Sequence, residues 1–225
     1  MSMTRRSFIV SASAFALAGC QTTGNGSGLN LAANPPIETN PKTIYAAKPD
    51  EQFPLPAVNL NKLDPKFYRQ VVNYTSPEPA GTIIVDTPNR FLYLTMKDDK
   101  AVRYGVGIGR AGFSWGGRAE IAWKRPWPTW TPPKEMIKRQ PELKKYADGM
   151  EPGLHNPLGA RALYIYENGK DTLYRLHGTP EVASIGKAVS SGCVRLINQD
   201  ICDLYERVPP HTRIVVLQKK GSLIG

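Results

Sequence analysis

Two residues near the C-terminal end of the chain have side chains suited to nucleophilic catalysis. His177 follows an alternating apolar run, and Cys193 lies in a turn of small residues that begins at Ser190. A thiol attacks only as the thiolate, and a nearby imidazole is a common means of forming that anion near neutral pH. The first hypothesis is a pair in which Cys193 is the nucleophile and His177 the base. The alternative is that both belong to the core.

The neighbours of Cys193 fit the same chemistry. Gly192 precedes the thiol and lets a substrate carbonyl approach the backbone, and the amides around Cys193, ahead of a predicted helix, are candidates for an oxyanion hole. Arg195 is suited to hold a carboxylate through two parallel hydrogen bonds. These residue types suit a catalytic cysteine that acts on a substrate carbonyl, with a carboxylate held nearby.

The first twenty residues indicate export. Arg5 and Arg6 precede an apolar run over residues 8–19, a pattern that resembles a twin-arginine signal. The run ends at Cys20 in a sequence that resembles a bacterial lipobox, which predicts a lipidated Cys20 as the mature N-terminus. Gln21 then favours the outer membrane of a Gram-negative cell. The alternative is an ordinary cleaved signal in which Cys20 has no role.

The net charge indicates the expected partners. The formal charge is +10, and removing residues 1–19 leaves about +8. Anionic polymers of the cell envelope are therefore expected partners rather than nucleic acid, although the charge also serves solubility alone.

The two remaining cysteines, Cys193 and Cys202, could pair in an oxidising compartment. Cys202, however, lies in a predicted helix at 198–208 that is capped by Asn198. It shares this helix with large apolar residues, which indicates burial. Cys193 is then left for chemistry.

The chain divides into four parts. A signal peptide at 1–19 is followed by a flexible tether at 20–59, which is rich in Gly, Asn, Pro and Ala. Residues 60–80 contain more apolar side chains and are expected to pack on the domain. The catalytic domain occupies 81–220.

The elements that must position the pair are mainly strands. Alternating and β-branched runs predict a mostly β domain with a few short helices. Asn168-Gly169 is the strongest hairpin signal, and a second hairpin is expected at 87–89. The predicted strands cover 82–86, 90–95, 102–109, 161–166, 171–176 and 212–217, and the predicted helices cover 134–140, 142–147 and 198–208.

Residues 123–133 contain three Trp and four Pro. Such a segment is not expected to form an interior strand. Aromatic faces offer rigid contact area, so this segment, including Trp130, is predicted to cover a substrate. The alternative is a loop packed down on the core.

Two further motifs are weak. Residues 107–112 match G-x-G-x-x-G, but no helix is predicted after them, so a dinucleotide site is not expected. The histidines and cysteines lack the close spacing of zinc ligands. The sequence therefore predicts no metal and no cofactor.

Several motifs together resemble one family. They are His177-Gly178-Thr179, the run from Ser190 to Arg195, and the segments 89–93, 107–110, 130–137 and 156–163. Over about residues 80–218 the chain is similar to the L,D-transpeptidase catalytic domain, the YkuD-type, ErfK/YbiS-like family. Many members have His where this chain has Ser191. The resemblance implies a sandwich-like or barrel-like β domain.

The resemblance also implies a reaction on peptidoglycan stem peptides. Cys193 would attack the carbonyl of the third stem residue, a diamino acid, and release the terminal D-Ala. His177 would move the proton, the carbonyl of Gly178 would orient its ring, and Ser191 would assist by hydrogen bonding. An amine would then take the acyl group, giving a 3–3 cross-link or attachment of an outer-membrane protein or lipoprotein. An L,D-endopeptidase, a carboxypeptidase or a non-catalytic binding lipoprotein remain alternatives.

Overall fold

The computed structural model describes residues 36–109, 116–190 and 193–218. The predicted signal, Cys20, Ser191 and Gly192 lie outside these residues. Within the described ranges, no helix has the length and apolar character that crossing a bilayer requires.

A mixed sheet of nine strands dominates the described residues, in the order β1-β4-β3-β2-β11-β6-β7-β8-β10, and β5 pairs with β9 separately. The strands are β1 (Gln70–Asn73), β2 (Ile83–Asp86), β3 (Phe91–Thr95), β4 (Lys100–Gly105), β5 (Ile108–Gly109), β6 (Gly117–Pro126), β7 (Arg161–Glu167), β8 (Lys170–Thr179), β9 (Ala188–Ser190), β10 (Val194–Ile197) and β11 (Thr212–Leu217). The helices are α1 (Pro41–Ile44), α2 (Lys134–Arg139) and α3 (Asn198–Arg207), with 3-10 turns η1 (Leu60–Lys62), η2 (Pro65–Phe67), η3 (Pro141–Tyr146) and η4 (Val182–Ser184).

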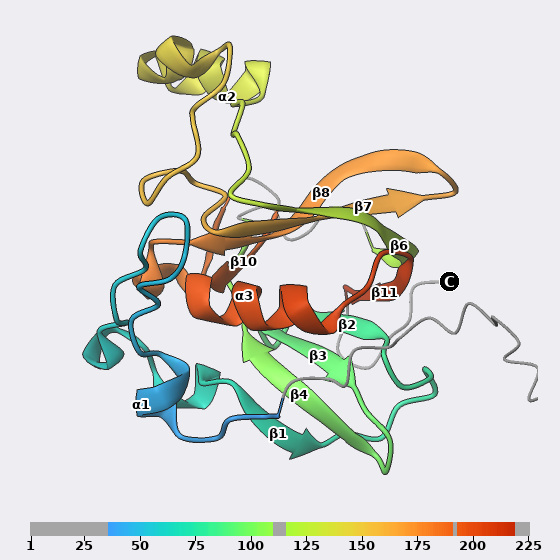
Figure 1. The fold of residues 1–225 in the computed structure, drawn as a ribbon. Coiled ribbons are helices and arrows are strands. Elements are labelled where there is room, and N and C mark those ends of the chain that lie inside the picture. Colours follow the sequence, from blue (N-terminus) through green and yellow to red (C-terminus); the bar gives the residue numbers. More distant parts are fainter. Residues whose placement is uncertain (1–35, 110–115, 191–192, 219–225) are drawn as a thin grey trace, which may run out of the picture. The chain divides into compact units, whose positions relative to one another are not determined.

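The sheet curls around α3. Figure 1 shows this helix between β7, β8 and β10 on one side and β2, β3 and β4 on the other. One cluster of buried side chains joins both halves of the sheet to the helix, and each such side chain stabilises the fold by about 1.5–3 kcal/mol. Its members include Ile83, Leu92, Val102, Leu163, Leu176, Leu196, Ile201 and Leu204. The predicted mostly β fold with few short helices is confirmed.

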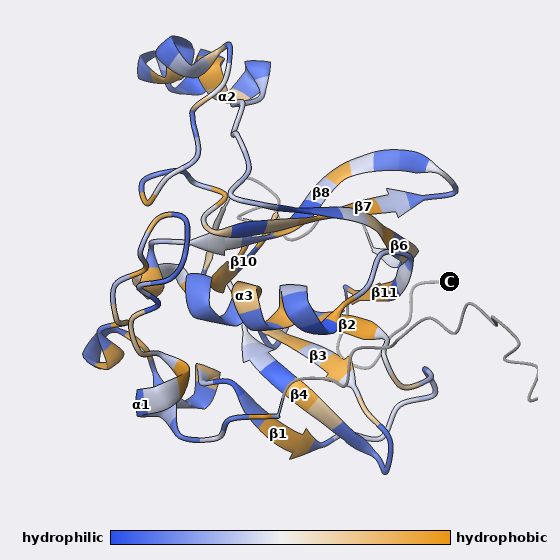
Figure 2. Ribbon diagram, viewed as in Figure 1, coloured by the Kyte–Doolittle hydropathy of each residue, from blue (hydrophilic) through white to orange (hydrophobic). Residues whose placement is uncertain are grey.

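Hydrophilic residues concentrate away from this core. In Figure 2 the segment around α2 and η3 and the tip of the β7–β8 hairpin are coloured mainly as hydrophilic. The hairpin turn has positive φ at Asn168 (50°) and Gly169 (75°), as a two-residue turn with both central residues left-handed requires. The strongest turn signal of the sequence therefore sets the register of β7 against β8.

Residues 41–59 belong to the fold, which differs from the expected flexible tether at 20–59. Tyr45 and Leu55 are each only 2% exposed. Leu55 lies in a buried cluster with Trp127, and Tyr45 lies in another that includes side chains of residues 60–80. Sparse but large apolar residues anchor this segment, and they show no periodicity because the segment is mostly irregular.

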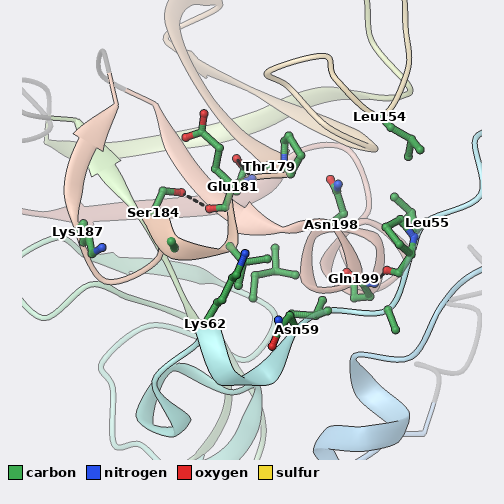
Figure 3. Close-up of a pocket in the computed structure, with 17 residues that line it drawn as sticks. Leu55, Asn59, Lys62, Leu154, Thr179, Glu181, Ser184, Lys187, Asn198 and Gln199 are labelled. Carbon is green, nitrogen blue, oxygen red and sulfur yellow. Dashed lines mark hydrogen bonds between the residues drawn. The ribbon is translucent and has the colours of Figure 1, made fainter.

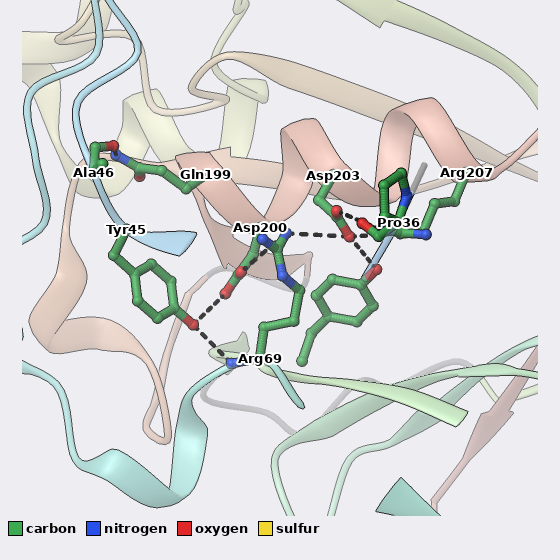
Figure 4. Close-up of polar contacts among 9 residues, drawn as sticks. Pro36, Tyr45, Ala46, Arg69, Gln199, Asp200, Asp203 and Arg207 are labelled. Carbon is green, nitrogen blue, oxygen red and sulfur yellow. Dashed lines mark hydrogen bonds and ion pairs between the residues drawn. The ribbon is translucent and has the colours of Figure 1, made fainter. Parts of the chain in front are cut away.

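Buried polar contacts attach the N-terminal residues to α3 (Figure 4). The hydroxyl of Tyr45 donates to Asp200 at 3.1 Å and accepts from the backbone N–H of Arg69 at 2.8 Å. The Arg69 guanidinium lies 3.1 Å from Asp203 and 3.7 Å from Asp200. Tyr104 of β4 also donates to Asp203, at 2.7 Å. The helix inside the sheet is thus fixed by charge as well as by apolar packing.

Two local predictions were wrong, and a third holds. Residues Trp123 to Pro126 extend β6, but they pair with β7 alone, because the pairing of β6 with β11 ends at Ile121, so this segment is not an interior strand. Asn198 does not cap α3; its side chain accepts a hydrogen bond from the Ala160 N–H instead. His177 lies within β8 and not after its end, since the strand continues to Thr179.

Asp200→Asn is expected to change how stability depends on pH. Desolvation raises the pKa of Asp200 to about 7, although Arg69 opposes the shift. Between about pH 4 and 7 the folded state keeps this proton and the unfolded state loses it, so the contribution of Asp200 to stability falls as pH rises, by on the order of a few kcal/mol. The lowered pKa of His177 acts in the opposite direction, but equally in both proteins. Urea unfolding at pH 4.5 and 8 should show a smaller loss in the variant.

Asp64→Asn is the matched control, because Asp64 is exposed on the surface. It should keep the pH dependence of the original protein over this window. If Asp200→Asn and the original protein lose the same stability between the two pH values, the buried carboxyl does not titrate as described.

Candidate active site

The predicted base and the predicted arginine lie on the face of the sheet that points away from α3. Leu176 and Val194 are opposite each other on the parallel strands β8 and β10, and both belong to the core. Successive side chains in a strand point to opposite faces, so His177 and Arg195 point outward. These two residues are themselves register partners. Gly178 confirms this orientation, because a Cβ there would collide with Asn198 of α3.

Cys193 directly precedes β10, and continuing the register of β10 against β8 by one residue places it beside Arg175. Its thiol forms a hydrogen bond with the backbone of Arg175, as this register leads us to expect. His177 follows Arg175 by two residues on the same face of β8. Cys193 and His177 are thus diagonal neighbours on adjacent strands, an arrangement suited to proton transfer between thiol and imidazole.

His177 is buried and neutral. Its Nδ1 lies 2.7 Å from the carbonyl oxygen of Gly178, so the ring donates there and leaves Nε2 as the acceptor. The side chain is only 4% exposed. Desolvation lowers the pKa of His177 to about 4; the hydrogen bond to Gly178 opposes this shift, and the charge of Arg195 adds to it. At neutral pH the imidazole is therefore uncharged, and its lowered pKa makes it a weaker proton acceptor than a free imidazole.

The thiol of Cys193 is held protonated in the resting protein. Desolvation raises its pKa, while the backbone hydrogen bond from Arg175 and the charges of Arg175 and Arg195 lower it. Two cations thus flank the position where a thiolate forms. The second cysteine, Cys202, is buried on α3, and neither thiol forms a disulfide with another cysteine of the described ranges.

Arg175 is a functional candidate that sequence reasoning missed. Its guanidinium forms two hydrogen bonds of 2.7 Å with Asp171 and lies 4.4 Å above the ring of Tyr164. These contacts hold the charge beside Cys193. The signal in the sequence was the alternation of β8, which places residue 175 on the same face as His177, but only the parallel partner β10 brings it next to the thiol.

Arg195 forms an ion pair through its side chain and two hydrogen bonds through its backbone. Its guanidinium donates to Glu181 at 2.8 Å, and the Glu181 side chain is 68% exposed. Its backbone exchanges two hydrogen bonds with Gly107, of 2.9 and 2.8 Å. A Cβ at Gly107 would lie 2.6 Å from the carbonyl oxygen of Ser184, so only glycine allows this approach. The pair with Glu181 marks a position where a carboxylate binds Arg195.

The Trp/Pro segment divides into three parts. Trp123 belongs to β6, Trp127 is buried against Phe53, and Trp130 forms two backbone hydrogen bonds with Met150. The ring of Trp130 lies 6.4 Å from that of Tyr146. The alternative of a loop packed on the core therefore holds for Trp127, whereas Trp130 lies in the segment that carries α2 and η3.

The helix predicted to follow the amides around Cys193 does not begin next to them. β10 separates Cys193 from α3, so the N-terminus of the helix lies at the far end of that strand. A hollow of about 600 Å³ opens at this end (Figure 3). Thr179, Glu181 and Ser184 line it on one side, and Lys62 and Leu55 line it on the other. Residues 55–62 thus build one wall of a cavity next to the strand that holds His177.

This geometry can be compared with known proteins. The family model of the L,D-transpeptidase catalytic domain, YkuD, matches residues 80–216. The chain belongs to this family. The resemblance drawn from the sequence motifs is therefore confirmed, and the match contains both candidates, His177 and Cys193.

Two curated relatives in the family come from Escherichia coli K12. The chain is 35% identical to the probable L,D-transpeptidase YbiS over 139 residues, which are 60% of this chain and 43% of that protein. It is 35% identical to the probable L,D-transpeptidase ErfK/SrfK over 146 residues, 61% of this chain and 44% of that protein. The chain spans less than half the length of these two relatives.

Two solved structures are also similar. A Brucella melitensis protein described as a probable carnitine operon oxidoreductase is 46% identical, with a TM-score of 0.49 and coverage of 71% of this chain and 99% of that one. An L,D-transpeptidase from Mycobacterium smegmatis is 17% identical, with a TM-score of 0.45 and coverage of 60% and 58%.

Arg175→Met is expected to make Cys193 a weaker nucleophile. Removing the guanidinium raises the pKa of the thiol further and leaves the charge of Asp171 uncompensated beside it. The rate of alkylation by iodoacetamide at pH 7 should fall about three- to tenfold, and the midpoint of its pH profile should move upward. Arg125→Met, on the same outward face but further from Cys193, is the control. Equal profiles for the two variants would contradict the assigned effect.

Proposed function

We propose that this chain is a cysteine-dependent L,D-transpeptidase that acts on peptidoglycan stem peptides. One observation carries the proposal: continuing the parallel register of β10 against β8 by one residue places Cys193 diagonally across from His177. Family membership supplies the substrate class. The flanking arginines suit an anionic substrate that forms an acyl-enzyme.

The first step is attack on the donor stem. Nε2 of His177 takes the proton of the Cys193 thiol, and the sulfur attacks the carbonyl carbon of the third stem residue. A thioester forms, the peptide bond to the terminal D-Ala breaks, and His177 gives its proton to the departing amine. The Gly178 carbonyl holds the imidazole in the tautomer that this transfer needs.

Positive charge supports the first step. Arg175 and Arg195 stabilise the sulfur as it becomes anionic, and the Arg175 backbone N–H adds a hydrogen bond. In this proposal the backbone amides around Gly192 and Cys193 receive the developing oxyanion, and Ser191 assists by hydrogen bonding. These groups act when charge develops, so they lower the barrier rather than only strengthening binding.

Arg195 anchors a stem carboxylate. The ion pair with Glu181 is partly open to solvent, and such pairs contribute only about 0–1 kcal/mol. A substrate carboxylate can therefore replace Glu181 with little loss. Trp130 and the segment around it contact the substrate from the side of α2.

The second step is attack by an amine on the thioester. The amine nitrogen forms the new amide bond, the sulfur leaves, and the proton of the amine returns through His177 to the thiolate. An acceptor on another stem gives a 3–3 cross-link, and an acceptor on an outer-membrane protein or lipoprotein attaches that protein. No cofactor takes part in either step.

We further propose that the chain is exported and lipid-anchored through Cys20 at the outer membrane. The basic, apolar and small-residue pattern of residues 1–20 supports this. Cys20→Ala should abolish incorporation of labelled palmitate and release the protein from membranes into the periplasmic fraction. Palmitate incorporation equal to that of the original protein would remove this part of the proposal.

Cys193→Ala is expected to abolish transfer. Incubation with tetrapeptide muropeptides, followed by mass analysis of products, should show release of D-Ala and a cross-linked dimer for the original protein only. The loss should exceed about a thousandfold because the nucleophile itself is missing. Labelling by a carbapenem should disappear in the same variant.

Cys202→Ala is the matched control, because it removes the other described thiol from a buried position. It should keep transfer and labelling. Products formed only by hydrolysis, with or without an added amine, would favour an endopeptidase or carboxypeptidase on the same site. Unchanged turnover in Cys193→Ala would contradict the acyl-enzyme.

A further inference from the structure

A stacked aromatic pair lies in line with the nucleophile. Trp123 of β6 is the register partner of Tyr164 on β7, and Tyr164 is the partner of Arg175 on β8. Cys193 continues the same row beside Arg175. The rings of Trp123 and Tyr164 are 3.5 Å apart at an interplanar angle of 10°. The row therefore leads from an aromatic platform, defined here as Trp123 and Tyr164, to the reactive thiol.

The platform is rigid, and one side of it is open. Tyr164 has neighbours on both sides, since Trp123 stacks on it and the Arg175 guanidinium lies 4.4 Å from its ring centroid. The indole N–H of Trp123 donates to the Tyr166 hydroxyl at 3.4 Å. Trp123 is nevertheless 40% exposed. An indole held in place with exposed area offers a flat binding surface at a low cost in conformational entropy.

A hollow lies next to Tyr166, the hydrogen-bond partner of Trp123. It has a volume of about 420 Å³, within the range of small-molecule sites, and Tyr166 forms part of its wall. Glu120, the register partner of Tyr166, and Arg213 supply side chains of opposite charge to its lining. Donors and acceptors of both signs beside an aromatic face suit a neutral ligand with many hydroxyl groups better than an ion.

The spacing matches the donor substrate. Neighbouring strands lie about 4.8 Å apart, so the three strand steps from Cys193 to Trp123 span about 14 Å. Three extended residues of a stem span about 10–11 Å. The link from the first residue to its sugar accounts for the remainder. When the third stem residue reaches the thiol, the sugar that carries the stem can reach the platform.

We propose that the exposed indole of Trp123, held in place by Tyr164, binds a pyranose ring of the glycan strand that carries the donor stem. The apolar face of the ring lies on the exposed indole, and its hydroxyl groups point toward Tyr166, Glu120 and Arg213. This inference rests on the proposed function and adds a glycan subsite to it. The enzyme then acts on stems attached to glycan in preference to free peptides.

The test compares two donors. For the original protein and for Trp123→Ala, kcat/KM is measured with a disaccharide-tetrapeptide and with the free tetrapeptide. The ratio of the two values should fall about tenfold in Trp123→Ala, and Trp123→Phe should recover much of it. Tyr74→Ala is the matched control, because it removes a ring stacked at 4.1 Å on Tyr93 in the other half of the sheet. Thermal unfolding checks that each variant is folded.

Binding without chemistry separates this proposal from the proposed function. Calorimetric titration with peptide-free oligosaccharides of N-acetylglucosamine should show binding that Trp123→Ala weakens at least tenfold and Tyr74→Ala leaves unchanged. This result supports the subsite even if neither donor is turned over. A lack of turnover with both donors would overturn the proposed transferase activity but not the glycan subsite. Donor transfer with an unchanged ratio and equal oligosaccharide binding in Trp123→Ala would overturn the glycan subsite.

Discussion

The parallel pairing of β8 with β10 is the constraint on which the site depends. It joins two segments that the chain separates by a turn, η4 and β9, and it fixes their register. That single register sets Arg195 opposite His177 and Cys193 beside Arg175. A slip of one residue would turn the thiol toward α3 and away from substrate. The two backbone hydrogen bonds between Gly107 and Arg195 stabilise the pairing from the other edge of β10.

The curled sheet explains why this pairing is stable. α3 fills the inside, so the inner faces of β8 and β10 are occupied by apolar side chains, and the outer face is left for chemistry. The N-terminal residues add a second attachment, since Tyr45 and Arg69 hold Asp200 and Asp203 of α3. The same segment lines the hollow beside Glu181. Segments remote from the nucleophile in sequence thus shape the space around it.

Local patterns predicted the fold class and several elements well. β11 over Thr212–Leu217 and the turn at Asn168-Gly169 follow from alternation and turn chemistry, which depend on nearest neighbours. Non-local pairing was not accessible in the same way. β6 was missed because Trp123 and Pro126 at its end are not typical of a strand, and its position depends on pairing with β7 and β11. Arg175 went unnoticed as part of the site because its relation to Cys193 exists only across β10.

The resting electrostatics distinguish this site from a preformed thiolate–imidazolium pair. Burial favours neutral His177 and a protonated Cys193, since both shifts oppose charge. Two arginines nevertheless stand beside the sulfur. A neutral resting state protects the thiol from oxidation, because the thiolate is the species that oxidises. In the proposed reaction the arginines stabilise the anion only as the proton leaves for His177, so reactivity develops together with attack on the stem rather than before it.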